Sequence, residues 1–125
     1  MNEEQWLRGL NHLSFEQVIQ VHFGLQEKIK EHYKKRASGD NLNIAIELCK
    51  QQIALSSLAL QSLKKKHEIS VLEYESLTNK KHPSPEFFVP KHHGYTQYRA
   101  ILKKNKKFTD IEELDNKMRG LGWLD

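Results

Sequence analysis

The sequence predicts an all-α protein, a helical bundle of about five to six helices. Apolar residues recur at three- and four-residue spacing over 15–33, 44–55 and 95–118, which is the period of a helix buried on one face. All three prolines fall between residues 83 and 90, so the long segments lack the residue that most disrupts helices. The 125 residues are 38% hydrophobic and 29% charged. We therefore expect one domain over 1–125 with long solvated faces.

The first two helices are predicted from their ends. Residues 3–11 form a short helix with Trp6, Leu7 and Leu10 on one side. Ser14 and Gln17 then have the spacing of a capping box, which opens a long helix. Basic residues and Gly39 indicate where that helix stops. Its predicted buried face consists of Phe15, Val18, Ile19, His22, Leu25, Ile29 and Tyr33.

The middle of the chain predicts two further helices. Asp40 or Asn41 is expected to cap the first, whose apolar stripe runs over 44–55. Ser56 and Ser57 are expected to break the stripe and to cap a shorter helix that closes at 64–66. Residues 67–78 fit either one or two helical turns or a short extended piece.

A loop is predicted for residues 79–90, because this segment contains Pro83, Pro85 and Pro90. Phe87 and Phe88 lie between the prolines. Two adjacent aromatic side chains are expected to cover the core rather than to stand in water. The alternative is an exposed aromatic clamp for a partner.

The last segment predicts an antiparallel helical hairpin. Apolar residues recur at helical spacing on both sides of the polar connection 103–107, and Gly120 and Gly122 supply a stop. We expect His93 to help cap the first helix. We expect this hairpin and a similar one before the proline loop to pack against the long N-terminal helix. The hairpin's predicted buried cluster is Tyr95, Leu102, Phe108, Ile111 and Leu114.

This hairpin resembles a tetratricopeptide repeat, a 34-residue helix-turn-helix unit. Tyr95, Tyr98 and Leu102 resemble the aromatic and aliphatic positions of the first helix, and 108–111 resembles the opening of the second. The sequence departs from the pattern at Arg99, Ile111 and Met118, where small residues are usual, and it has no closing proline. The pieces 44–56 and 93–123 also resemble small bacterial proteins of unknown function with a degenerate repeat. The resemblance implies a repeat-like helical fold and a protein-binding style.

No catalytic or metal-binding pattern is visible. The seven histidines include no His-Glu-x-x-His pair and no His-x-x-x-His pair within one helix, and the six glycines are dispersed. Cys49 lies in an apolar stripe, where a small buried hydrophobe is expected rather than a reactive thiol. We therefore expect no cofactor, no metal and no enzymatic activity.

The charge pattern suggests how partners bind. Residues 80–107 contain eight Lys or Arg and one acid, whereas 110–125 contain five acids and two bases. We expect a protein–protein interaction module that binds a peptide or protein through a helical groove. The alternative is an electrostatic nucleic-acid binder that uses the basic segment 80–107, with weak and non-specific binding. Candidate partner-binding residues are Phe87, Phe88, His92, Arg99, Lys103 and Lys104.

Two further expectations concern class and location. A small immunity or antitoxin-like protein is a third class, which the sequence does not separate from the interaction module. A single cysteine, with no signal peptide, favours the cytoplasm. No segment has the roughly 20 apolar residues of a membrane span, so no membrane association is expected.

Overall fold

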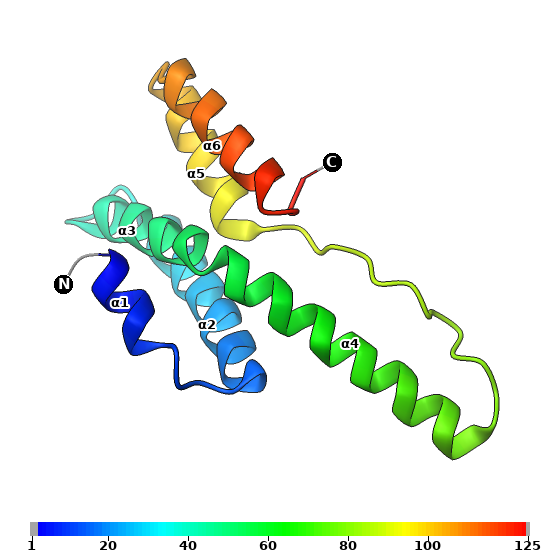
Figure 1. Cartoon of the computed structure of the whole chain (residues 1–125). Helices are drawn as coiled ribbons and strands as arrows, with labels where there is room; N and C mark the ends of the chain where they lie inside the picture. Colours follow the sequence, from blue (N-terminus) through cyan, green and yellow to red (C-terminus); the bar gives the residue numbers. More distant parts are fainter. Residues whose placement is uncertain (1–2, 125) are drawn as a thin grey trace.

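The computed structural model describes residues 3–124, and these residues form six helices (Figure 1). Within this range no residue is in a strand. The predicted all-α class is therefore confirmed. The helices are α1 (Glu3–Gly9), α2 (Phe15–Lys34), α3 (Asn41–Ala54), α4 (Ser56–Thr78), α5 (His93–Lys104) and α6 (Phe108–Gly120).

The helices other than the second half of α4 pack together into what we call the body, and α2 and α3 lie at its centre. The predicted capping box opens α2: the Gln17 N–H donates to Ser14 Oγ at 3.2 Å, and the Ser14 N–H donates to Gln17 Oε1 at 2.9 Å. Asp40 occupies the N-cap position of α3, where its carboxylate accepts a hydrogen bond from the Asn43 side chain at 2.8 Å but none from a backbone N–H of the helix. Gly39 has φ +54° in the turn between them, a conformation that glycine adopts without strain. Two antiparallel helices result, and Val18, Leu25 and Ile53 lie in the core.

The predicted break after α3 is confirmed, but the residue at the N-cap of the next helix differs from the prediction. The N-cap of α4 is Leu55, which has no side-chain cap, so Ser56 and Ser57 do not cap this helix. One intervening residue is too short a connection for two helices to fold back on each other. Figure 1 shows α4 continuing away from α3. The expected hairpin before the proline loop is therefore absent from the described residues.

Helix α4 is also longer than predicted. It continues past 64–66 to Thr78 and ends at Asn79, which has φ 56°, the left-handed conformation common after a helix. Residues 67–78 are thus helical and not extended. We call residues 64–78 the arm, since they extend beyond the body, and residues 79–92 the strap, since they run back from the arm's tip to α5 (Figure 1).

Helices α5 and α6 form the predicted C-terminal hairpin, and α5 packs on α3. Leu102, Ile111 and Leu114 are buried as expected, and Tyr95 packs against the same core. Phe108 contradicts the prediction, because it is 63% exposed. It is the first residue of α6, at the hairpin's outer end, where no other helix covers it. Helix α6 ends at Gly120, and Gly122 has φ +91°.

Candidate partner-binding surface

The six candidate residues do not form one site. Phe87 and Phe88 lie on the strap, Phe87 half-buried and Phe88 75% exposed. Of the two alternatives for these aromatics, Phe87 therefore follows the core-covering one and Phe88 the exposed one. Lys103 and Lys104 are exposed at the end of α5. His92 is only 3% exposed, which contradicts its assignment to a contact surface.

A groove runs between the arm and the strap, with a cavity volume of about 310 Å³. The arm supplies one wall, at intervals of three and four residues that place its members on a single helix face. Pro85 and Phe87 of the strap supply the other wall. The arm residues are Lys64, His67, Glu68, Val71 and Leu72.

Contacts with the arm hold the strap in place. The ring Nε2 of His67 lies 3.2 Å from the Pro85 carbonyl oxygen, which accepts its hydrogen bond. The His82 N–H donates to Glu75 Oε2 at 3.0 Å. The His67 and Phe87 rings are 5.8 Å apart. These contacts hold residues 82–87 of the strap against the arm and so fix the shape of the groove.

Large apolar side chains of the arm and the strap are exposed, and one of them, Leu72, lines the groove. Leu72 is 60% exposed, Leu77 84% and Phe88 75%. Val89, next to Phe88, is 43% exposed. Burying such surface against a partner contributes a favourable free energy of about 25 cal/mol per Å² of apolar area removed from water. Apolar side chains gathered in this way typically mark an interaction site.

One lysine lines the groove, and two more follow the arm. Lys64 lies at the end near the body, and Lys80 and Lys81 follow directly after the arm's tip. None of these three lysines makes an ion pair with another described residue. Glu68 is the one acidic residue among those that line the groove. The groove is thus mainly apolar, with Lys64 as its one lysine.

His92 belongs instead to a buried polar cluster that we call the histidine cluster: His22, Gln52, Ser56, His92 and Trp123. His92 caps α5, because its Nδ1 accepts the Tyr95 N–H at 3.0 Å. The expected cap, His93, is the first residue of α5 and does not serve as its N-cap. The His92 ring meets Trp123 edge-on at 4.7 Å, and His22 stacks on Trp123 at 5.6 Å.

Ser56 and His92 in this cluster resemble a catalytic pair but lack its chemistry. Ser56 Oγ lies 2.9 Å from His92 Nε2. Because Nδ1 accepts a backbone hydrogen bond, the neutral ring carries its hydrogen on Nε2 and donates it to Ser56. A ring in this tautomer has no free nitrogen to take the serine proton. Ser56 is also 0% exposed, so a substrate has no access to it.

Burial shifts the pKa values of these groups. It lowers the pKa of His22 to about 4, and burial, reinforced by His22, lowers that of His92 to about 3. The Nδ1 of His22 has no hydrogen-bond partner among the described residues. Burial raises the pKa of the Cys49 thiol to about 12, so Cys49 is the inert core residue that the sequence predicts.

Arg99 is engaged within its own hairpin. Its Nε donates to Asp115 Oδ1 at 3.0 Å, and the Tyr95 hydroxyl donates to the same oxygen at 2.6 Å. Hydrogen bonds from Arg99 hold the pKa of Asp115 below its usual value, with a further contribution from Tyr95 against the opposing effect of burial. This network joins α5 to α6. Arg99 is therefore not available as a free contact residue.

The basic residues of 80–107 do not form one surface. Lys80 and Lys81 follow the tip of the arm, whereas Lys103 and Lys104 lie at the outer end of the C-terminal hairpin (Figure 1). Arg99, between them in sequence, is paired with Asp115. A phosphate backbone would therefore meet these charges in separate places.

Comparison with known proteins supplies no relative. No protein-family model, curated protein or solved structure matches the chain. Within residues 3–124, no group of three or more His, Cys, Asp or Glu side chains is placed to hold a metal ion. The helices described there also include none with the length and apolar character needed to cross a membrane.

Proposed function

We propose that this protein is a non-enzymatic interaction module whose arm and strap dock an amphipathic helix of a protein partner. The observation that carries this proposal is the apolar groove between them, whose lining includes Val71, Phe87 and the 60% exposed Leu72. Phe88, the next residue of the strap, is 75% exposed. Binding an apolar helix face in a groove is a common mode of peptide recognition. The expected partner helix has apolar residues at three- and four-residue spacing.

Charge defines the partner further. Lys64 in the groove, with Lys80 and Lys81 just after the arm, favours carboxylates on the flanks of the docked helix. The strap's aromatic side chains supply the large apolar contacts that dominate interface energies. The inert, buried Cys49 also suits a reducing compartment, which supports a cytoplasmic location. The tetratricopeptide resemblance of 93–123 remains a prediction, and the proposed site lies outside it.

The test uses synthetic helical peptides and backbone amide NMR shifts of the full chain. One peptide carries an apolar stripe with acidic flanks, and the second has the same composition with the stripe scrambled. We expect only the first to shift Val71, Leu72 and Phe87. Shifts spread over α2 or α6, or equal binding of both peptides, would contradict the proposed groove.

Two phenylalanine variants provide a matched comparison. Phe88→Asp removes a 75% exposed ring from the strap, and Phe108→Asp removes a 63% exposed ring from the far hairpin. Neither ring is buried, so both variants should fold. We expect Phe88→Asp to weaken peptide binding at least tenfold, equivalent to about 1.4 kcal/mol, and Phe108→Asp to leave it unchanged. Equal losses would show that the contact is not on the strap.

A further inference from the structure

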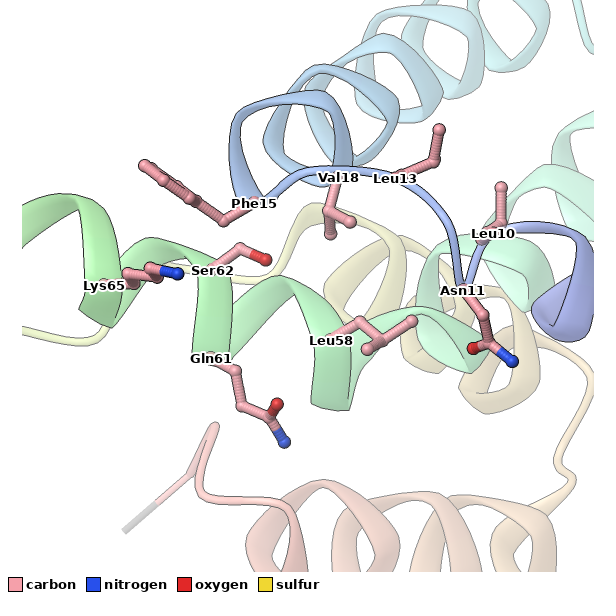
Figure 2. A pocket seen from close by; sticks show the side chains of 9 residues that line it. All are labelled: Leu10, Asn11, Leu13, Phe15, Val18, Leu58, Gln61, Ser62 and Lys65. Carbon is pink, nitrogen blue, oxygen red and sulfur yellow. The ribbon is translucent and has the colours of Figure 1, made fainter.

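A second cavity lies on another face of α4, away from the groove. It is open to solvent, has a volume of about 200 Å³, and is lined by the α1–α2 connection, the start of α2 and the first half of α4 (Figure 2). Its apolar wall consists of Leu10, Leu13, Val18 and Leu58. Positions 58, 61, 62 and 65 of α4 are three to four residues apart, so they share one helix face.

Ser62 gives this cavity an unused polar group. The residue is only 7% exposed, yet its hydroxyl makes no hydrogen bond to any other described residue. Figure 2 shows the side chain on the face of α4 that looks toward Phe15 and Val18. The fully buried side-chain polar atoms of the described residues that lack a partner are His22 Nδ1 and His93 Nε2 and do not include Ser62 Oγ, so this hydroxyl is reachable from the cavity. A ligand oxygen in the cavity would supply the missing partner.

Lys65 places a charge beside that hydroxyl. It is one helical turn from Ser62, and its Nζ lies 5.1 Å from the centre of the Phe15 ring. Lys65 makes no ion pair with any residue of the described range. The lining residues include no acid, and their other polar members are Asn11 and Gln61. One cation, one free hydroxyl and an apolar wall suit a ligand with one negative charge.

We propose that this cavity binds a small monocarboxylate with a short apolar tail. The carboxylate accepts hydrogen bonds from the Ser62 hydroxyl and the Lys65 ammonium group, and the tail packs against Leu13, Val18 and Leu58. The site is independent of the groove and of its protein partner.

Hexanoate is a suitable probe, with acetate and hexan-1-ol as comparisons. Acetate keeps the charge without the tail, and hexanol keeps the tail without the charge. By amide NMR shifts at Leu13, Val18 and Ser62, we expect hexanoate to bind at least tenfold more tightly than either. If acetate binds as well, only the charge matters; if hexanol does, only the apolar wall matters. Either result, or no shift at these residues, would overturn the proposal.

Variants of adjacent residues separate the site from general charge. Lys65→Met keeps the apolar stem and should weaken hexanoate binding at least tenfold. Lys66→Met removes an equal charge from the next, differently oriented position and should have no effect. Ser62→Ala should leave the melting temperature unchanged or slightly higher, because the hydroxyl has no partner to lose, while weakening hexanoate severalfold. Equal losses from Lys65→Met and Lys66→Met, or unchanged binding by Ser62→Ala, would rule out the assigned contacts.

Discussion

At the scale of single residues, Gln52 joins three helices. It is fully buried on α3, where its Nε2 donates to the His22 carbonyl oxygen of α2 at 2.9 Å and its Oε1 accepts the Gly94 N–H of α5 at 2.7 Å. Both ends of the amide are therefore occupied. The side chain has no freedom to move without breaking a buried hydrogen bond.

Gly94→Ala should lower stability by forcing Gln52 out of its position. A Cβ at Gly94 would lie 2.5 Å from Gln52 Oε1 and 3.2 Å from Gln52 Cβ, so Gln52 must move. We expect a loss of about 1–3 kcal/mol in the free energy of unfolding, measured by urea denaturation. Gly24→Ala is the control: nothing lies within 4 Å of its Cβ, and alanine in a helix should add about 0.5–1 kcal/mol. Equal effects of the two substitutions would contradict the close packing.

The histidine cluster should make stability depend on pH. In the unfolded chain His22 and His92 bind protons near pH 6.5, whereas in the folded protein their pKa values are about 4 and about 3. Their contribution is therefore complete above pH 6.5 and is lost as pH falls toward 3. At pH 5 each should cost about 2 kcal/mol relative to pH 7.5.

Urea denaturation at several pH values checks this expectation. His93 should add to the loss, since burial and the nearby Lys30 lower its pKa as well. Stability that stays constant between pH 7.5 and 5 would show that these rings are not held neutral.

His92 illustrates why sequence alone misplaces some residues. Its partners Gln52, Ser56 and Trp123 lie about 30 to 40 positions away along the chain, and no spacing rule connects them. The sequence places His92 in a basic loop, where exposure is the natural expectation. His22 differs, because its position on the apolar stripe of α2 correctly predicts that it is buried.

At the scale of helices, the arm shows what apolar periodicity detects. Stripes over 15–33 and 95–118 are visible because those helices bury one face. The arm's apolar residues are not buried in a core: Val71 and Leu72 line the groove, Leu72 is 60% exposed, and Leu77 is 84% exposed. A helix that extends away from the body buries little surface, so its sequence needs no continuous apolar stripe. For this reason the sequence does not decide whether residues 67–78 are helical or extended.

Helix α6 contains Phe108, which the sequence predicts to be buried but which is exposed, and Met118, which is fully buried. Phe108→Ala should change the free energy of unfolding by less than about 1 kcal/mol, since the ring is 63% exposed. Met118→Ala should cost about 2–5 kcal/mol, because Met118 is 0% exposed in the core. Thermal denaturation of the two variants gives the comparison. A larger loss for Phe108→Ala would restore the hairpin register predicted from sequence.

At the scale of the whole molecule, the distribution of charge limits nucleic-acid binding. Most basic residues of 80–107 lie either just after the tip of the arm or at the outer end of the C-terminal hairpin, while Lys91 lies at the end of the strap and Arg99 within α5. A single nucleic-acid strand would contact few of them at once. The number of phosphates neutralised sets how steeply affinity falls with salt.

A mobility-shift titration at two salt concentrations tests this. We expect weak binding at 50 mM salt that is lost at 200 mM, and a shallow dependence that reflects few phosphate contacts. Lys103→Gln with Lys104→Gln should reduce it without affecting the docking of a peptide on the arm. Tight binding that persists at 200 mM salt would instead favour a nucleic acid as the partner.

The strap also determines how the C-terminal hairpin is attached. Between the arm's tip and α5 the chain has no helix, and the hairpin is held on the body by contacts such as Gln52 to Gly94 and Trp123 Nε1 to the Ser56 carbonyl oxygen. The strap is therefore a covalent linker between the hairpin and the surface it packs on. It keeps the hairpin at a high effective concentration near that surface, of about millimolar order for a short linker. A hairpin that detaches rebinds as an intramolecular event, independent of the protein's concentration. If the strap were cut, the same contacts would become those of a two-fragment complex that dissociates on dilution.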